Sequence, residues 1–144
     1  MDKAALVEAI LQSSGDAIIA TDSEGRITAW SAGASRIFGF GETAALGQSL
    51  DLIIPENQRK RHWDGYREVM RTGKSRYADG ATLAVPALRA DGSRISIEFT
   101  IVPLKDGDGA MTGMVSILRD VTERFAELRE LRKIAAAAKA AAPA

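Results

Sequence analysis

Apolar and polar residues alternate along two stretches in the second half of the chain. Residues 94–101 carry an apolar side chain at every second position, which is the period of a β-strand with one buried face. Residues 111–118 have a similar strand-like composition, and the Asp-Gly pairs in 105–109 favour a hairpin turn because both residue types tolerate positive φ. The pattern predicts an antiparallel sheet whose apolar face must be covered. The first strand contributes Ile95, Ile97, Phe99 and Ile101 to that face.

The rest of the chain supplies further strands and a cover of helices. Two compact β runs separated by a turn predict a hairpin, and a strand pattern leads into the Asp91-Gly92 turn. These strand patterns occupy residues 17–21, 26–30 and 76–88. Helices are predicted at 32–38, within 41–47, and at 58–71, the last capped by Asn57 and ended by Gly73. We expect an α+β fold with short helices over one face of a five-stranded antiparallel sheet.

An amphipathic helix is predicted at each end of the chain. We expect a helical cap at residues 1–13, a central domain at 14–119, and an outgoing helix with an alanine-rich tail at 120–144. The first helix either lies on its own domain or forms a dimer contact, and both roles are open. We expect a homodimer formed through the two apolar stripes. These are Leu6, Val7, Ile10 and Leu11 in the first helix and Val121, Phe125, Leu128, Leu131 and Ile134 in the last.

Charge and composition exclude several classes of protein. Nineteen acidic residues balance nineteen basic ones, so no net field attracts nucleic acid or a membrane surface. The chain has no cysteine, which excludes disulfides, zinc-thiolate sites and cysteinyl photochemistry and fits a reducing, cytoplasmic location. No apolar run approaches the roughly 18 residues of a membrane span, and the N-terminus lacks a signal-peptide pattern.

No constellation of residues supports catalysis. The segment 39–41 lacks the later glycine of a phosphate-binding loop, and 106–109 lacks most ligands of a calcium loop. The single histidine, His62, is not part of a serine–histidine–acid pattern that could activate a nucleophile. We therefore expect that the chain is not an enzyme.

Short motifs along residues 4–124 resemble the PAS domains of the S-box type in their order and spacing. They are Asp16-Ala17-Ile18, 22–25, Ile27-Thr28-Ala29-Trp30, 37–40, Gly47, Ile54-Pro55-Glu56, 89–93 and 119–123. The resemblance implies that sheet and helices enclose a small-molecule cavity. It also implies that the outgoing helix, entered through Asp120 and Thr122, passes a signal to a kinase, another output domain or a neighbouring subunit.

One helix resembles the FixL-type haem oxygen sensors more closely, in Pro55-Glu56-x-x-Arg59-x-Arg61-His62-x-x-x-Tyr66. That resemblance implies haem b, with His62 as the axial ligand of the iron, and a diatomic gas or the redox state as the signal. His62, Tyr66 and Met70 are spaced i, i+4, i+8 and would share one helix face. The expected opposite wall of the cofactor site is Leu83, Ile97, Phe99, Ile101, Met114, Ser116 and Leu118.

The sequence departs from the oxygen sensors at one position. The stretch that would carry their distal arginine has Leu83 at the closest match, so bound oxygen would lack a charge-assisted donor. Carbon monoxide, nitric oxide or a redox signal fits this site better. Met111 or Met114 is a candidate sixth ligand, although methionine on an interior strand more often packs in a core.

Alternatives to haem stay open on the sequence alone. His62 is equally compatible with a helix-surface position, and Trp63 and Tyr66 with an ordinary core. The basic run 59–61 either pairs with haem propionates or is a solvated helix start. If His62 does not bind haem, the chain is a cofactor-free module that binds a small organic ligand or acts in dimerisation or protein interaction. A non-covalently bound flavin is also compatible with the sequence.

Overall fold

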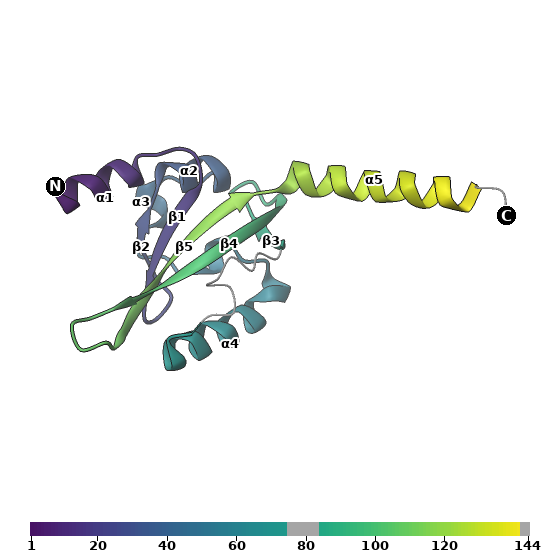
Figure 1. The fold of residues 1–144 in the computed structure, drawn as a ribbon. Coiled ribbons are helices and arrows are strands. Elements are labelled where there is room, and N and C mark those ends of the chain that lie inside the picture. The colour runs from purple at the N-terminus through teal and green to yellow at the C-terminus, as the bar shows by residue number, and fades with distance from the viewer. Residues whose placement is uncertain (75–83, 142–144) are drawn as a thin grey trace.

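The computed structural model describes residues 1–74 and 84–141. Its centre is one antiparallel sheet with the strand order β2-β1-β5-β4-β3 (Figure 1). The strands are β1 (Ala17–Asp22), β2 (Ile27–Trp30), β3 (Val85–Leu88), β4 (Arg94–Lys105) and β5 (Met111–Asp120). The predicted five-stranded antiparallel sheet is therefore confirmed. The strand pattern within 76–88 is borne out at Val85–Leu88, and its earlier part lies outside the described residues.

The long strands β4 and β5 form the hairpin that the alternation predicted. Phe99 lies opposite Leu118 and Ile101 opposite Ser116, so these side chains share a face of the sheet. β4 is longer than the alternating stretch, because pairing with β5 continues to Lys105. Gly109 in the connecting turn has a φ of 80°, which is a conformation that glycine adopts without strain.

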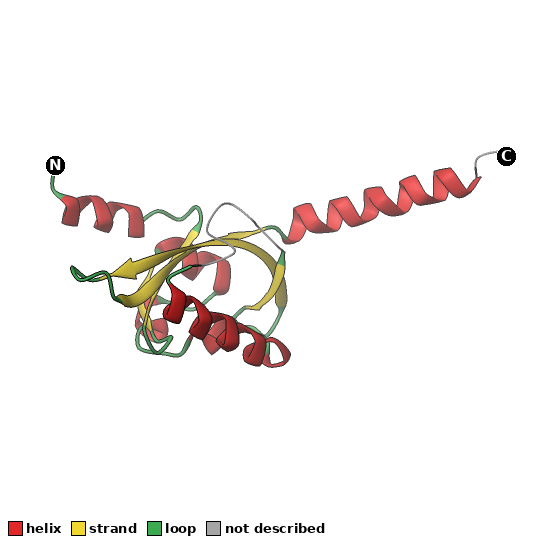
Figure 2. Cartoon of the chain, turned by 60° about the horizontal axis from the view of Figure 1, so that its bottom comes forward, coloured by secondary structure: helices red, strands yellow, loops and turns green. Residues whose placement is uncertain are grey.

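Helices cover the inner face of the sheet, which is the face that carries the buried side chains. They are α2 (Ala32–Phe38), α3 (Glu42–Ala45), the 3-10 turn η1 (Leu50–Ile53) and α4 (Glu56–Thr72). In Figure 2 the curved sheet wraps around α2 and α4. Trp30, Phe38, Ile19 and Ile27 are almost completely buried at the centre of this core. Ser31 caps α2 by accepting from the Ala34 N–H at 3.1 Å.

The start of α4 differs from the prediction. The helix begins at Glu56 behind Pro55, whose φ is −56°, and not at Gln58 behind an Asn57 cap. Proline suits a helix start because its φ is already helical and its missing N–H would have no partner there. The Asn57 side chain instead accepts a bond from Arg94 at 3.3 Å. The predicted end at Gly73 is correct, with a φ of 70°.

The flanking helices α1 (Lys3–Leu11) and α5 (Thr122–Ala141) bury none of their residues. They leave the body of the domain on opposite sides (Figure 1). Leu6, Val7 and Ile10 are exposed, whereas Leu11 at the end of the stripe is half-buried. The alanine-rich segment continues α5 to Ala141. Among the described helices, none is long and apolar enough to cross a membrane.

Candidate functional site

Tyr66 connects α4 to the sheet. Its side chain is buried, and its hydroxyl donates to the main-chain carbonyl of Asp22 at the end of β1. The Thr21 hydroxyl, also buried, lies 2.8 Å from the Tyr66 oxygen and completes the pair of bonds as the donor. Burial raises the pKa of Tyr66, the Thr21 hydrogen bond opposes that rise, and the Asp22 carboxylate adds to it. Tyr66 is therefore a neutral phenol that fixes α4 to β1.

Trp63 lies one helical turn before Tyr66, with the two ring centroids 5.2 Å apart, and fixes the helix to η1 and to the β1–β2 turn. Its indole N–H donates to Asp51 of η1 at 2.7 Å. Its six-membered ring covers Gly25 in the β1–β2 turn so closely that a Cβ at Gly25 would lie 2.2 Å from ring carbons. Gly25 also has a φ of 80°. Both the backbone conformation and the packing of Trp63 therefore require glycine at this position.

His62 lies beside these two aromatic residues and is mostly buried. Its ring centroid is 4.5 Å from that of Trp63 and 6.0 Å from that of Tyr66. Burial lowers the pKa of His62 to about 4, against a smaller opposing effect of the Asp51 carboxylate. The imidazole is therefore neutral at pH 7. Its Nδ1 is buried and has no hydrogen-bond partner among the residues that the structure describes.

This state of His62 fits an iron ligand. A neutral imidazole offers a lone pair to a metal, whereas an imidazolium does not. A buried polar atom without a protein partner is rare in folded proteins and is commonly satisfied by an ordered water or a bound group. In ligated histidines, the second ring nitrogen normally has a hydrogen-bond partner. Nδ1 of His62 has none in the described chain, so a bound group would have to complete or rearrange this environment.

The predicted opposite wall is formed by neighbouring strands of the sheet. Ile97, Met114 and Leu118 are buried, and Phe99, Ile101 and Ser116 are half-buried. β4 and β5 carry these six residues, and α4 packs against β5. Met70 on α4 is half-buried. The structure thus brings the wall together on one sheet face and places His62, Tyr66 and Met70 on the helix beneath it. Leu83 lies outside the described residues.

Asp120 and Thr122 meet at the junction between β5 and α5. The Thr122 hydroxyl donates to the Asp120 carboxylate at 2.6 Å, and the Thr122 N–H donates to the same oxygen at 3.0 Å. Asp120 therefore caps the first turn of α5. On the other side, the Ser96 N–H donates to the Thr122 hydroxyl oxygen at 2.9 Å. Val121 between them is buried and donates its N–H to the Ser96 carbonyl. The two predicted signalling residues thus attach α5 to β4.

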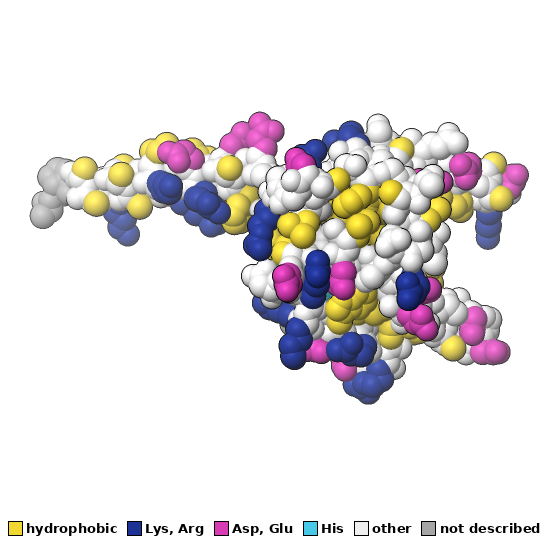
Figure 3. All heavy atoms as spheres, turned by 180° about the vertical axis from the view of Figure 1, so that it is seen from behind, with side chains coloured by type: hydrophobic (Ala, Val, Ile, Leu, Met, Phe, Trp, Pro, Cys, Tyr) yellow, Lys and Arg dark blue, Asp and Glu magenta, His cyan; other side chains and the backbone are white. Residues whose placement is uncertain are grey.

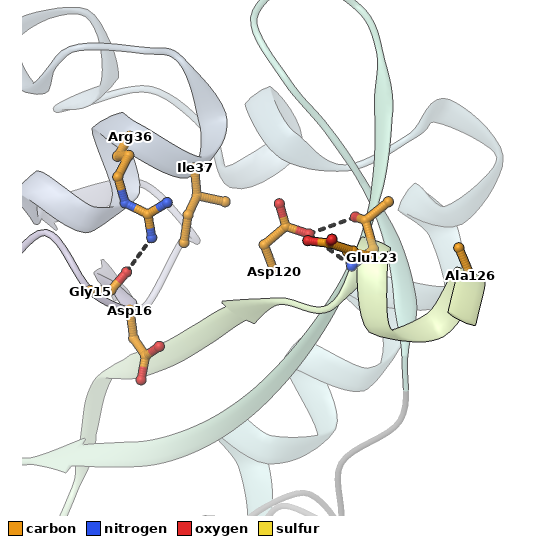
Figure 4. A pocket seen from close by; sticks show the side chains of 8 residues that line it. Gly15, Asp16, Arg36, Ile37, Asp120, Glu123 and Ala126 are labelled. Carbon is orange, nitrogen blue, oxygen red and sulfur yellow. Dashed lines mark hydrogen bonds between the residues drawn. The ribbon is translucent and has the colours of Figure 1, made fainter. Parts of the chain in front are cut away.

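A cavity of about 410 Å³ opens beside this junction (Figure 4). Asp120, Thr122, Glu123 and Ala126 line it from the α5 side, and Gly15, Asp16, Arg36 and Ile37 line it from the segment before β1 and from α2. Figure 4 shows the Arg36 guanidinium turned toward the carbonyl of Gly15, to which it donates at 2.6 Å. A second hollow, of about 310 Å³, lies between α1 and α2. Neither contains His62 or a predicted wall residue.

Ion pairs around the junction were not predicted from the sequence. Arg119 pairs with Asp16 at 3.4 Å and so connects the end of β5 to the residue before β1. Arg124 in the first turn of α5 pairs with Glu98 of β4 at 2.8 Å. Arg119 and Asp16 are 103 residues apart, and no local signal joins them. Arg119 and Asp16 both lie within motifs of the PAS resemblance, which is the one sequence feature that they share.

Comparison with known proteins identifies relatives in sequence. The chain is 32% identical over 127 residues to the sensor protein FixL of Bradyrhizobium diazoefficiens. The match covers 88% of this chain and 25% of FixL, so the chain spans about a quarter of the length of that relative.

Solved structures show the same fold. The PAS domain of a Colwellia psychrerythraea protein superimposes with a TM-score of 0.73 at 23% identity, over 85% of this chain and 99% of that one. An RNA-binding light-oxygen-voltage receptor superimposes with a TM-score of 0.76 at 22% identity, over 93% of this chain and 37% of that one. The family model described as PAS fold matches residues 5–121. The chain belongs to the PAS family.

Proposed function

We propose that this PAS domain is a sensor module that binds haem b through His62 and responds to a diatomic gas or to the redox state. The observation that carries the proposal is the buried, neutral imidazole of His62, whose Nδ1 has no partner in the described chain. The similarity to the sensor protein FixL supports the same conclusion. Haem would supply an iron centre that binds a gas or changes its oxidation state.

The residues of this chain would orient and shield such a cofactor. Tyr66 and Trp63 pack against the His62 ring, and their hydrogen bonds fix α4 to β1 and η1, so they would hold the imidazole in place. The apolar wall on β4 and β5 would exclude water from one face of a planar ligand. Because Leu83 is the closest sequence match to the distal arginine of the oxygen sensors, we expect carbon monoxide or nitric oxide to bind in preference to oxygen.

The proposed signal passes from this wall to α5. Ile97 of the wall lies opposite Asp120 across the β4–β5 ladder, and its neighbour Ser96 holds Thr122. A ligand that displaces β4 would therefore change the hydrogen bond that holds the first turn of α5 to the sheet. Such a change shifts the population of helix arrangements only if the ligand binds one arrangement more tightly. We propose homodimerisation through the flanking helices and a kinase or other output domain as the receiver.

Absorption spectroscopy tests the haem assignment. The purified protein is titrated with hemin, reduced with dithionite and exposed to carbon monoxide. A Soret band that shifts with carbon monoxide in the wild type and in Arg67→Ala, and that is lost in His62→Ala, is the expected result. Arg67 is the matched control because it is an exposed residue of the same helix outside the basic run 59–61. A His62→Ala protein with a full haem complement would refute His62 as the ligand.

A cofactor-free interaction module is the second candidate. It is favoured by the two flanking helices, which bury none of their residues and expose apolar stripes. In that case the spectrum stays flat after hemin addition, while the protein still associates through these helices. Flavin absorption bands in the purified protein would exclude both candidates and assign a different cofactor.

A further inference from the structure

The long helix α4 is attached to the rest of the domain unevenly along its length. Before its middle, Arg59 donates to the carbonyl of Ile54 at 3.1 Å and Trp63 donates to Asp51 at 2.7 Å, so η1 and the residue after it hold this half. Tyr66 in the middle is the one buried residue of the helix, all of which the structure describes. After Tyr66, no side chain of α4 forms a hydrogen bond or an ion pair with another described helix or strand.

The charged side chains of α4 stabilise the helix itself and not its attachment to the sheet. Lys60 and Arg67 pair with Asp64, and Arg71 pairs with Glu68, at spacings of three or four residues. All five residues are exposed, and charged side chains of both signs gather on the underside of the domain at the bottom of Figure 3. These pairs support the helix also in a state in which it separates from the sheet.

Gly65 lies between the attached half of α4 and Tyr66. A glycine inside a helix costs stability relative to alanine, because its backbone loses more freedom on folding. No packing contact requires glycine here, since an added Cβ would meet no atom of another described element within 4 Å. The backbone at Gly65 is helical, so a positive φ does not require glycine either. Gly65 therefore weakens the helix at the point where its attachment changes.

The Tyr66 side chain closes the space between α4 and the inner wall of the sheet. Its hydroxyl reaches Thr21 and the carbonyl of Asp22 at the end of β1. Thr21 lies opposite Met114 of the wall across the β1–β5 ladder. Thr21 and Met114 are only 4% and 2% exposed. A ligand from solvent therefore reaches this part of the wall only after the side chains that cover it, Tyr66 among them, move away.

We propose that the second half of α4 is a flap over the ligand site, with Gly65 as its hinge and Tyr66 as its latch. When the Tyr66 hydroxyl leaves the end of β1, the helix bends at Gly65 and a ligand reaches the wall on β4 and β5. His62 lies in the attached half beside Trp63 and keeps its position while the flap is open. This inference deepens the proposed function and rests on it for the identity of the ligand.

Thiol labelling measures the opening without any ligand, because the chain has no native cysteine. Met114→Cys places a thiol on the covered wall, and Ala34→Cys places one on the buried side of α2. The Met114→Cys thiol should react about thirtyfold faster in Tyr66→Phe, which lacks the latch bonds, and about fourfold slower in Gly65→Ala, which stiffens the hinge. The Ala34→Cys thiol should react more slowly in each background, because it becomes accessible only when the whole domain unfolds.

Ile37→Val is the control for stability, because it removes a methyl group from the buried side of α2 and leaves the flap unchanged. It should accelerate the labelling of Ala34→Cys and leave that of Met114→Cys within twofold of its rate. Equal labelling rates at the two sites in every background would mean that global unfolding exposes the wall, and the flap would be refuted. A Met114→Cys rate that Gly65→Ala does not lower would refute the hinge.

Stopped-flow binding of hemin connects the flap to the proposed site. The association rate should rise in Tyr66→Phe and fall in Gly65→Ala by the factors found in thiol labelling, while Ile37→Val binds at the wild-type rate. Association rates that stay equal while the labelling rates differ would refute the flap as the entry route and leave the haem proposal standing. Absence of hemin binding in every variant would refute the haem proposal, and the labelling rates would still decide whether α4 opens.

Discussion

The main-chain N–H of Ser96 donates to the hydroxyl oxygen of Thr122, with the two atoms 2.9 Å apart. This bond joins the start of β4 to the first residue of α5, and Ser96 is the direct neighbour of Ile97 on the inner wall. The same hydroxyl donates to Asp120. Thr122 therefore links β4 to the first turn of α5, and in the proposed function a movement of β4 would reach the helix through this residue.

Removal of the Thr122 hydroxyl should loosen the start of α5. Thr122→Val preserves the side-chain shape but leaves the Ser96 N–H without its bond, and we expect a loss of about 1 kcal/mol in the free energy of unfolding. Amide exchange at residues 122–125 should accelerate. Thr112→Val is the control, because it removes one hydroxyl bond to Leu104 in the distant hairpin. Equal exchange rates at 122–125 in both variants would contradict the anchoring role.

The same site should also control signalling without controlling ligand binding. In a fusion to a reporter kinase, Thr122→Ala or Asp120→Ala should abolish the response while the affinity for the ligand changes less than twofold. This result is expected because both residues lie at the helix junction and away from His62 on α4. The measurement compares kinase activity with the spectroscopic titration. An unchanged response in both variants would rule out this route.

Gly25→Ala should be more damaging than an ordinary glycine replacement. The new Cβ would meet the Trp63 ring at 2.2 Å, and the φ of 80° adds backbone strain. Gly92→Ala is the matched control, because its φ of 84° is similar and no atom lies within 4 Å of the built Cβ. We expect a loss of about 1 kcal/mol for the control and about 3 kcal/mol for Gly25→Ala in urea unfolding. Trp63→Leu in the same chain should recover part of the difference.

Tyr66 and Thr21 should behave as an energetically coupled pair. Tyr66→Phe leaves the Asp22 carbonyl and the Thr21 hydroxyl without their bonds in a buried place, and we expect a loss of about 2 kcal/mol in stability. Thr21→Val should cost about 1 kcal/mol. A double-mutant cycle measured by chemical denaturation should show that the combined loss is smaller than the sum. Strict additivity would mean that the two hydroxyls do not interact in solution.

The haem-free protein should lose stability as the pH falls from 6.5 to 4. The pKa of His62 is about 4 in the folded protein and 6.5 for an exposed histidine, as in the unfolded chain. As the pH falls through this window, the unfolded chain therefore binds a proton that the folded protein does not. From this shift we expect a loss of about 2 kcal/mol between pH 7 and pH 5. Because His62 is the only histidine, His62→Gln should remove this part of the slope. Identical slopes in both proteins would contradict the burial of the imidazole.

Local patterns in the sequence determined the elements and the inward faces of this domain. A strand exposes alternate side chains to opposite faces, so Ile95 and Ile97 could be assigned to the core before any contact was known, and both are buried. The end of α4 at Gly73 and the Asp-Gly turns could also be predicted from the sequence, because glycine adopts their positive φ values without strain. The apolar stripe of α5 also follows from periodicity, whereas its exposure beyond Val121 is a finding of the tertiary structure.

Contacts between distant segments were decided only by the tertiary structure. The sequence spacing placed Tyr66 on the face of α4 that points to the sheet, but its bond to Thr21 depends on where the helix crosses β1. The packing of Trp63 on Gly25 and the pairing of Arg119 with Asp16 have the same origin. The start of α4 was misassigned because Asn57 could cap a helix, whereas Pro55 starts it and Arg94 binds Asn57. Periodicity determines which face of an element is buried, and the packing of whole elements decides which residues meet there.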